Sequence, residues 1–181
     1  MRELVFFLEE PSAKAMLETL LPRMLDQSIT VRCVPFEGKQ DLEKQLTRKI
    51  RAYQNQRARF IVLRDQDSHP DCSAVKQRLL DLCEASGKAD HCLVRIACRE
   101  LETFYLADLA AVEQGLTLKG LSGLQPSRKF KSPDQLGSPS HELKTLTKGA
   151  YEKVAGSRAI GLYLGVDNAR SPSFRNLIGA I

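Results

Sequence analysis

The stretch FIVLRDQDS (residues 60–68) is an apolar run that ends in two aspartates separated by one glutamine. A short run this apolar is typical of a strand that is buried on both faces, as in a parallel sheet. Side chains two apart in a strand point to the same face, so we expect Asp65 and Asp67 to lie side by side with Gln66 turned away. Two close carboxylates repel each other more strongly as water is excluded. The stretch therefore predicts a metal ion, an arginine or a helix N-terminus beside them.

Three more apolar runs alternate with segments of helical character. The runs cover residues 4–8, 30–36 and 92–98, and helices are expected over 11–27, 37–54, 68–86 and 99–114. Pro11 suits the first turn of a helix, and Leu42, Leu46 and Ile50 repeat at helical spacing. Alternating strands and helices predict an α/β fold with a mostly parallel four-stranded sheet flanked by helices. We assign residues 1–114 to this core.

The chain changes character after residue 114. Residues 115–140 are rich in Gly, Pro and Ser and place Arg128, Lys129 and Lys131 around Phe130. A loop this long is usually functional or mobile, so we expect it either to clamp a substrate or partner or to move freely. Residues 141–181 predict a helical C-terminal section packed on the core, with one helix starting at Ser171–Pro172.

Composition narrows the classes of function. The chain carries 27 Lys and Arg against 22 Asp and Glu, a net charge of +5, which is compatible with a polyanionic partner. Its five cysteines form no CxxC pair, so we expect buried thiols in a reducing cytosol and no structural zinc site. No apolar stretch is long enough to span a membrane, and the N-terminus is too quickly acidic for a signal peptide. We therefore expect a cytoplasmic protein. No P-loop, GxSxG or GxGxxG motif is present.

Acidic residues follow three of the four expected strands. Ligands bind at the carboxyl ends of the strands in open α/β sheets, so these acids are expected to converge there. They are Glu9, Asp65, Asp67, Glu100 and Glu102, with Glu10 beside the first. A cluster of carboxylate oxygens suits Mg²⁺ or Mn²⁺. The alternative is that single acids cap the helices that follow them. If the fourth helix begins at Glu100, only one of Glu100 and Glu102 reaches the site.

Several cationic residues are candidates for binding phosphate near these acids. They are Lys39, Arg64, Arg99, Lys153 and Arg158. Lys39 is the strongest of them, because it follows Gly38 just past the end of the second strand. Arg64 directly precedes Asp65, and Arg99 directly precedes Glu100. We therefore favour an ordinary ion pair with an acid for both arginines.

Five stretches together resemble the DUF4276 family of Toprim-like proteins. They are FLEEPSAKAMLETLLPRML, PFEGKQDLEKQL, VLRDQDS, RIACRELETFYLADL and YEKVAGSRAI, and they cover nearly the whole chain. A strand ending in Glu followed by a strand ending in DxD is the pattern of the Toprim fold. That fold is shared by topoisomerases, bacterial primases and nucleases of the overcoming-lysogenization-defect type.

The resemblance implies roles for the acids. Glu9 is implied to be a general acid or base or a metal ligand, and Asp65 and Asp67 are implied to hold Mg²⁺. Glu100 or Glu102 is implied to supply a second metal site. Two departures from the Toprim pattern, Glu10 in place of glycine and Ser68-His69-Pro70 after DxD, bear on how a substrate approaches.

The resemblance also implies a bacterial origin and a role in anti-phage defence with an ABC-type ATPase partner. We therefore expect a metal-dependent nuclease that hydrolyses phosphodiester bonds in RNA or DNA. A second copy of the chain, in a homodimer, is a further candidate partner. The alternative is a non-catalytic metal- or nucleic-acid-binding subunit of such a complex.

Overall fold

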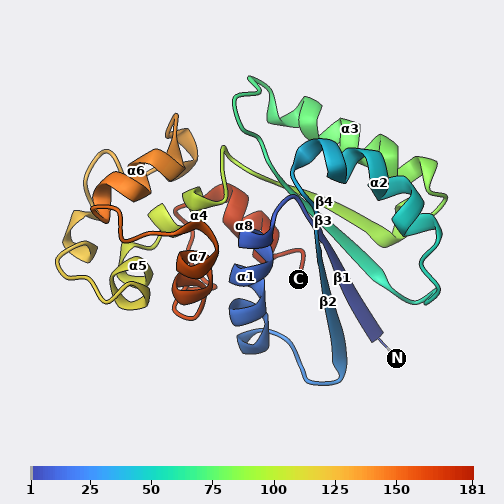
Figure 1. Cartoon of the computed structure of the whole chain (residues 1–181), viewed down its shortest axis with the longest axis horizontal. Helices are drawn as coiled ribbons and strands as arrows, with labels where there is room; N and C mark the ends of the chain where they lie inside the picture. The colour runs from blue at the N-terminus through green and yellow to red at the C-terminus, as the bar shows by residue number, and fades with distance from the viewer. Residues whose placement is uncertain (1) are drawn as a thin grey trace.

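A computed structural model describes residues 2–181 and has a fully parallel four-stranded sheet at its centre (Figure 1). The strand order is β2-β1-β3-β4. The strands are β1 (Arg2–Leu8), β2 (Ile29–Pro35), β3 (Arg59–Asp65) and β4 (Cys92–Ala97). Each parallel pair needs a crossover, and the helices between the strands supply it. The α/β fold expected from the sequence is confirmed.

Helices cover both faces of the sheet, as a parallel sheet requires. Those of the core are α1 (Pro11–Leu20), α2 (Lys39–Arg51), α3 (Cys72–Ala85), α4 (Glu102–Leu106) and α5 (Leu109–Gly115). Those of the C-terminal section are α6 (Pro139–Leu146), α7 (Lys153–Gly161) and α8 (Pro172–Ile178). In Figure 1, α2 and α3 lie on one face, α1 lies on the other, and α7 packs on the far side of α1. No helix within residues 2–181 is long and apolar enough to cross a membrane.

Two hydrophobic clusters fill the two sides of the sheet. The cluster under α2 and α3 includes Phe7, Phe60, Leu42 and Leu46, all nearly inaccessible to water. The cluster on the α1 side continues without a break into the C-terminal helices, where it includes Phe174. The C-terminal section is thus part of the same buried core, and it holds the ends of the strands in place.

Local signals explain where several helices begin. Pro11 occupies the first turn of α1, and Ser171 caps α8 by accepting a hydrogen bond from Phe174 N–H at 3.1 Å. The helix expected from residue 68 begins instead at Cys72, because the Asp71 side chain caps it through Ser73 N–H. Both observed starts at proline confirm the expectation from sequence.

The helix expected over residues 99–114 is two helices. Helix α4 ends before Asp108, whose side chain caps α5 by accepting from Ala111 N–H at 3.1 Å. The segment 115–140 contains two short 3₁₀ turns and is anchored by Gln125, which donates to the carbonyl oxygens of Leu106 and Phe130. Phe130 is buried, so the basic cluster around it surrounds an anchored side chain.

Candidate active site at the carboxyl edge of the sheet

Glu9 lies at the centre of a group of acids at the carboxyl ends of β1 and β3. Glu9 directly follows β1, and its N–H donates to Leu63 O of the neighbouring strand at 3.2 Å. Its carboxylate accepts a hydrogen bond from Asp65 N–H at 3.0 Å and is 3.8 Å from the Arg64 guanidinium. Burial raises the pKa of Glu9 from its ordinary 4.5 to about 7, with Asp67 adding to the rise. Glu9 therefore changes charge near neutral pH.

Asp65 is the last residue of β3 and a buried acid of the group. Only 7% of it is exposed, and no Lys, Arg or His within residues 2–181 forms an ion pair with its carboxylate. Burial raises the pKa of Asp65 well above its usual range, and the nearby charges of Glu9 and Glu102 raise it further. This side chain is a buried oxygen donor without an ion-pair partner among residues 2–181, which is costly for an ionised carboxylate.

Asp67 occupies a different environment from Asp65. The strand ends at Asp65, and Asp67 adopts a left-handed backbone conformation with φ 55°. Strand alternation therefore does not extend to Asp67, and Gln66, expected to turn away, is buried and donates to His69 O. The Asp67 carboxylate instead forms an ion pair with Lys39 Nζ at 2.8 Å. The expectation that alternation aligns the two aspartates is wrong because the strand stops first.

Lys39 reaches Asp67 because of the turn before α2. Gly38 has φ 98°, a backbone conformation that residues other than glycine rarely adopt. Its N–H donates to Glu9 O at 2.9 Å. Lys39 is the first residue of α2 and so starts beside the acids. Its pKa is raised, mainly by the hydrogen bond to Asp67. The structure thus brings this phosphate-binding candidate to the predicted edge of the sheet.

A second cation approaches from the C-terminal section. Lys153 begins α7, and its Nζ lies 2.8 Å from Oε1 and 2.6 Å from Oε2 of Glu10. The charges of Glu102 and Asp65 also act on Lys153 and help to raise its pKa above the usual value, against the effect of burial. Lys153 is therefore close to three carboxylates that come from three separate segments of the chain.

Glu102 belongs to the acid group, whereas Glu100 serves a helix end. Glu102 is almost fully buried and accepts a hydrogen bond from the Tyr151 hydroxyl at 2.9 Å. Burial raises its pKa. The Glu100 carboxylate accepts from Ser140 N–H at 2.7 Å, in the first turn of α6. The two side chains diverge, as expected for a helix beginning at Glu100, although α4 begins two residues later, at Glu102.

Of the remaining cationic candidates, Arg64 contacts the acid group through Glu9, and Arg158 and Arg99 make other contacts. Arg64 is buried and forms an ion pair with Glu43 in addition to its contact with Glu9, as the ion-pair interpretation expected. Arg158 pairs with Glu18 of α1 at 3.0 Å and is not brought to the acid group. Arg99 contributes its carbonyl oxygen, which accepts from Asp67 N–H at 2.8 Å and so fixes the loop after β3.

Sequence reasoning missed the tyrosines behind the acids. Tyr151 links Glu102 to Ser157, and the Tyr105 hydroxyl is fully buried with no hydrogen-bond partner among residues 2–181. Tyr151 is 49 residues from Glu102 in sequence, so no local spacing signals it, whereas Tyr105 follows Glu102 closely in the run ETFY. In this arrangement no group of three or more His, Cys, Asp and Glu side chains within residues 2–181 is positioned to hold a metal ion.

Comparisons with known proteins agree with this architecture. The model of the family DUF4276, described as a domain of unknown function, matches residues 8–181. The chain therefore belongs to the DUF4276 family. A search of curated proteins found no significant relative.

Among solved structures, the chain is similar to the C-terminal region of the Burkholderia pseudomallei OLD protein. The two are 17% identical, with a TM-score of 0.56 over 97% of this chain and 95% of that one. At an identity this low, the structural similarity shows a shared fold and no more. The DUF4276 membership expected from the sequence is confirmed, and so is a fold shared with an OLD-type protein.

Proposed function

We propose that this chain is a metal-dependent nuclease that hydrolyses phosphodiester bonds in RNA or DNA at the acid group around Glu9. The observation that carries the proposal is Asp65, a buried carboxylate with a raised pKa and no ion-pair partner within residues 2–181. A fold gains nothing from such a group unless a ligand compensates its charge, and perturbed carboxylates of this kind gather at functional sites. The fold shared with the C-terminal region of an OLD protein supports the same class of chemistry.

The donor atoms of the acid group have the chemistry that Mg²⁺ or Mn²⁺ requires, but within residues 2–181 they are not gathered around one point, so binding a cation would require these side chains to move together. Carboxylate oxygens are the ligands that these hard cations prefer, and Asp65, Asp67 and Glu102 are the residues that would hold them. When bound, the cation supplies an activated water and stabilises negative charge on the phosphate. Lys39 forms an ion pair with Asp67, and Lys153 forms one with Glu10. The cation would therefore compete with Lys39 for the Asp67 carboxylate.

Glu9 suits the transfer of a proton. A group with a pKa of about 7 is present in both protonation states near neutral pH, which is where general acid–base catalysis is most effective. The hydrogen bond from Asp65 N–H and the Arg64 guanidinium orient its carboxylate. Glu9 would thus accept a proton from the attacking water or return one to the leaving oxygen.

Lys39 and Lys153 are suited to bind phosphate oxygens. Their ammonium groups enter the site from opposite parts of the chain and are about half exposed, so they are free to exchange a carboxylate for a phosphate. A cation near the transferred phosphate stabilises the charge that develops during hydrolysis. A partner ATPase and a role in anti-phage defence remain predictions from the family resemblance.

The same ion pairs favour a second function, a non-catalytic subunit. In that account Lys39 and Lys153 neutralise Asp67 and Glu10 permanently, and the acid group stabilises the meeting of α2, α7 and the sheet. The two functions differ in whether substitution of an acid abolishes hydrolysis.

The test is cleavage of labelled single- and double-stranded DNA and RNA with Mg²⁺ or Mn²⁺. We expect cleavage by the wild type and a loss of at least about 100-fold in Asp65→Asn. Asp81→Asn, an exposed acid on α3, is the matched control and should leave the rate unchanged. Cleavage that survives in Asp65→Asn would assign the activity to another site or to a contaminant. No cleavage of any substrate by the wild type, alone or with an ATPase partner, would support the non-catalytic subunit.

A further inference from the structure

Strand β2 is one of the two edge strands of the sheet, and within residues 2–181 it pairs only with β1. Phe36 N–H, just past the strand, donates to Leu8 O of β1. Backbone groups of successive residues point to opposite sides of a strand, so even-numbered residues of β2 face β1. Val31 and Cys33 therefore direct their N–H and C=O groups to the open side. Pro35 faces the same way, where its missing N–H costs the sheet nothing.

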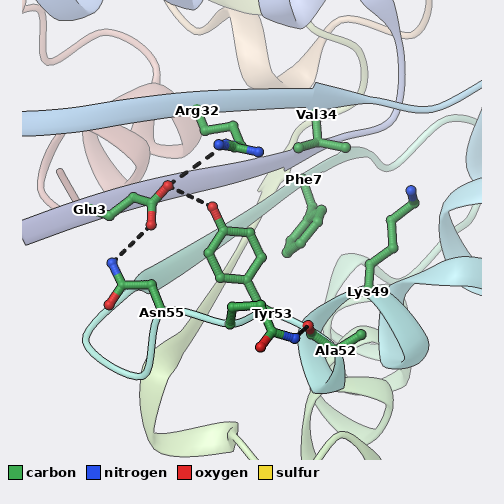
Figure 2. A pocket seen from close by; sticks show the side chains of 9 residues that line it. Glu3, Phe7, Arg32, Val34, Lys49, Ala52, Tyr53 and Asn55 are labelled. Atoms are coloured by element: carbon green, nitrogen blue, oxygen red, sulfur yellow. Dashed lines mark hydrogen bonds and ion pairs between the residues drawn. The ribbon is translucent and has the colours of Figure 1, made fainter.

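Surface cavities lie beside β2 on both faces of the sheet. On the α1 face, Ile29, Val31 and Cys33 line a cavity of about 370 Å³ together with leucines of α1 and the segment after it. On the α2 face, a cavity of about 640 Å³ lies over Phe7, Val34 and the Tyr53 ring (Figure 2). Val31 is 37% exposed, and its partner on β1, Leu4, is half-buried. Strand β2 thus carries apolar side chains, typical of a buried strand, that no other element covers among residues 2–181.

We propose that a second copy of this chain covers β2, with the two β2 strands antiparallel about a two-fold axis through Val31. The axis is normal to the sheet, so like-numbered residues of the two copies share a face and the axis passes through one residue. An axis through Arg32 would place two guanidinium groups opposite each other. An axis through Cys33 would set Pro35, which has no donor, against Val31. An axis through Thr30 would pair Val31 with Ile29, whose N–H already donates to Asp26 O. The axis through Val31 avoids all three difficulties.

In this register the backbone groups at the open side find partners. Val31 N–H of each copy donates to Val31 C=O of the other, and Cys33 N–H donates to Ile29 C=O. Ile29 N–H takes no part, because it already donates to Asp26 O at 3.0 Å. The apolar side chains of Ile29, Val31 and Cys33 then form one continuous stripe across the two copies on the α1 face.

The charges on the opposite face are complementary in the same register. Thr30 lies beside Glu3 in the pairing of β1 with β2, and it would lie opposite Arg32 of the second copy. The Glu3 carboxylate already accepts from the Tyr53 hydroxyl at 2.6 Å and lies 3.7 Å from its own Arg32 (Figure 2). Each Glu3 would therefore lie between two arginines, one from each copy, at the rim of the 640 Å³ cavity. This inference does not depend on the proposed nuclease activity.

Sedimentation velocity of the full chain over about 1–200 μM, the range of weak specific interfaces, tests the contact. We expect a dimer for the wild type and for Val31→Thr, which keeps a β-branched side chain. Val31→Lys should be monomeric, because two ammonium groups would meet at the axis, while circular dichroism shows an unchanged fold. A wild type that is monomeric throughout, or a Val31→Lys protein that still dimerises, overturns the proposal.

Disulfide trapping tests the register independently of the stability of Val31→Lys. In the proposed dimer the Cα atoms of the two Val31 residues are about 5.5 Å apart, within reach of a disulfide. Val31→Cys should cross-link under oxidised glutathione, which is reduced to two thiols as the protein disulfide forms. Thr30→Cys should not, because its counterpart is displaced along the strand by two residues, beyond about 7 Å. Mass spectrometry of the cross-linked peptides distinguishes this disulfide from those of the native cysteines. A cross-link at residue 30 and none at residue 31 refutes the register.

Discussion

Replacing Glu9 by glutamine should stabilise the protein at neutral and alkaline pH. The pKa of Glu9 is about 7 in the folded protein against 4.5 ordinarily, mainly because the carboxyl group is buried. Between these values the unfolded chain has lost the proton and the folded protein retains it. Stability is therefore lost as pH rises from about 4.5 to 7, and the loss is complete above the folded pKa.

The size of the effect follows from the shift in pKa. One pKa unit corresponds to about 1.4 kcal/mol, so ionised Glu9 should destabilise the fold by about 3 kcal/mol at pH 8. Glutamine keeps the oxygen that accepts from Asp65 N–H but carries no charge. Glu9→Gln should thus match the wild type near pH 4 and be more stable by about 3 kcal/mol at pH 8.

Urea unfolding followed by circular dichroism from pH 4 to pH 8 measures this difference. Glu18→Gln is the matched control, because Glu18 is a partly exposed acid whose ion pairs are with Lys14 and Arg158 on the surface. The control should differ from the wild type by less than about 1 kcal/mol at every pH. If Glu9→Gln were equal to or less stable than the wild type at pH 8, the account of Glu9 as a buried acid without adequate compensation would be refuted.

Three further predictions concern neighbouring groups. Lys39→Met removes an exposed ion pair with Asp67, so the free energy of unfolding should change by less than about 1 kcal/mol in urea, while nucleic-acid cleavage falls at least about 10-fold. Gly161→Ala would place a Cβ 2.7 Å from the backbone of α1 and should destabilise the protein by about 1–3 kcal/mol, whereas Gly123→Ala, in open space, should not. Glu100→Ala removes the acceptor at the start of α6 and should cost about 1 kcal/mol in thermal unfolding without lowering the cleavage rate, and a large loss of cleavage would return Glu100 to the site.

The sheet and its ligand edge follow from patterns that are written locally. Continuous apolar runs of five to seven residues separated by helical periodicity leave few folds other than a parallel sheet covered on both faces. Acids directly after two neighbouring strands must meet at one edge, which is why Glu9 and Asp65 were found from sequence. The strand order β2-β1-β3-β4 makes β1 and β3 neighbours, so the acids that end them lie side by side.

The details of the site depend on contacts that no local pattern encodes. Lys153 reaches Glu10 across 143 residues because α7 packs against α1, and Gly161 permits that close approach. Asp67 leaves the strand direction through a left-handed turn that is held by the Arg99 carbonyl. A single sequence indicates which residues are charged, but the pairing of Lys153 with Glu10 depends on how two helices far apart in sequence pack.

Thermal unfolding with and without Mn²⁺ or Mg²⁺ tests most directly whether the acid group binds a cation. Metal at about 100 times its Kd adds about 2.7 kcal/mol, which should raise the wild-type midpoint by about 5–10 °C for a chain of this size. Measured at pH 8, where Glu9 is ionised, the shift should be present in the wild type and in Asp81→Asn and absent in Asp65→Asn. A shift of equal size in Asp65→Asn, or no shift in the wild type with or without a non-cleavable oligonucleotide, would contradict the assignment of a metal site to this edge of the sheet.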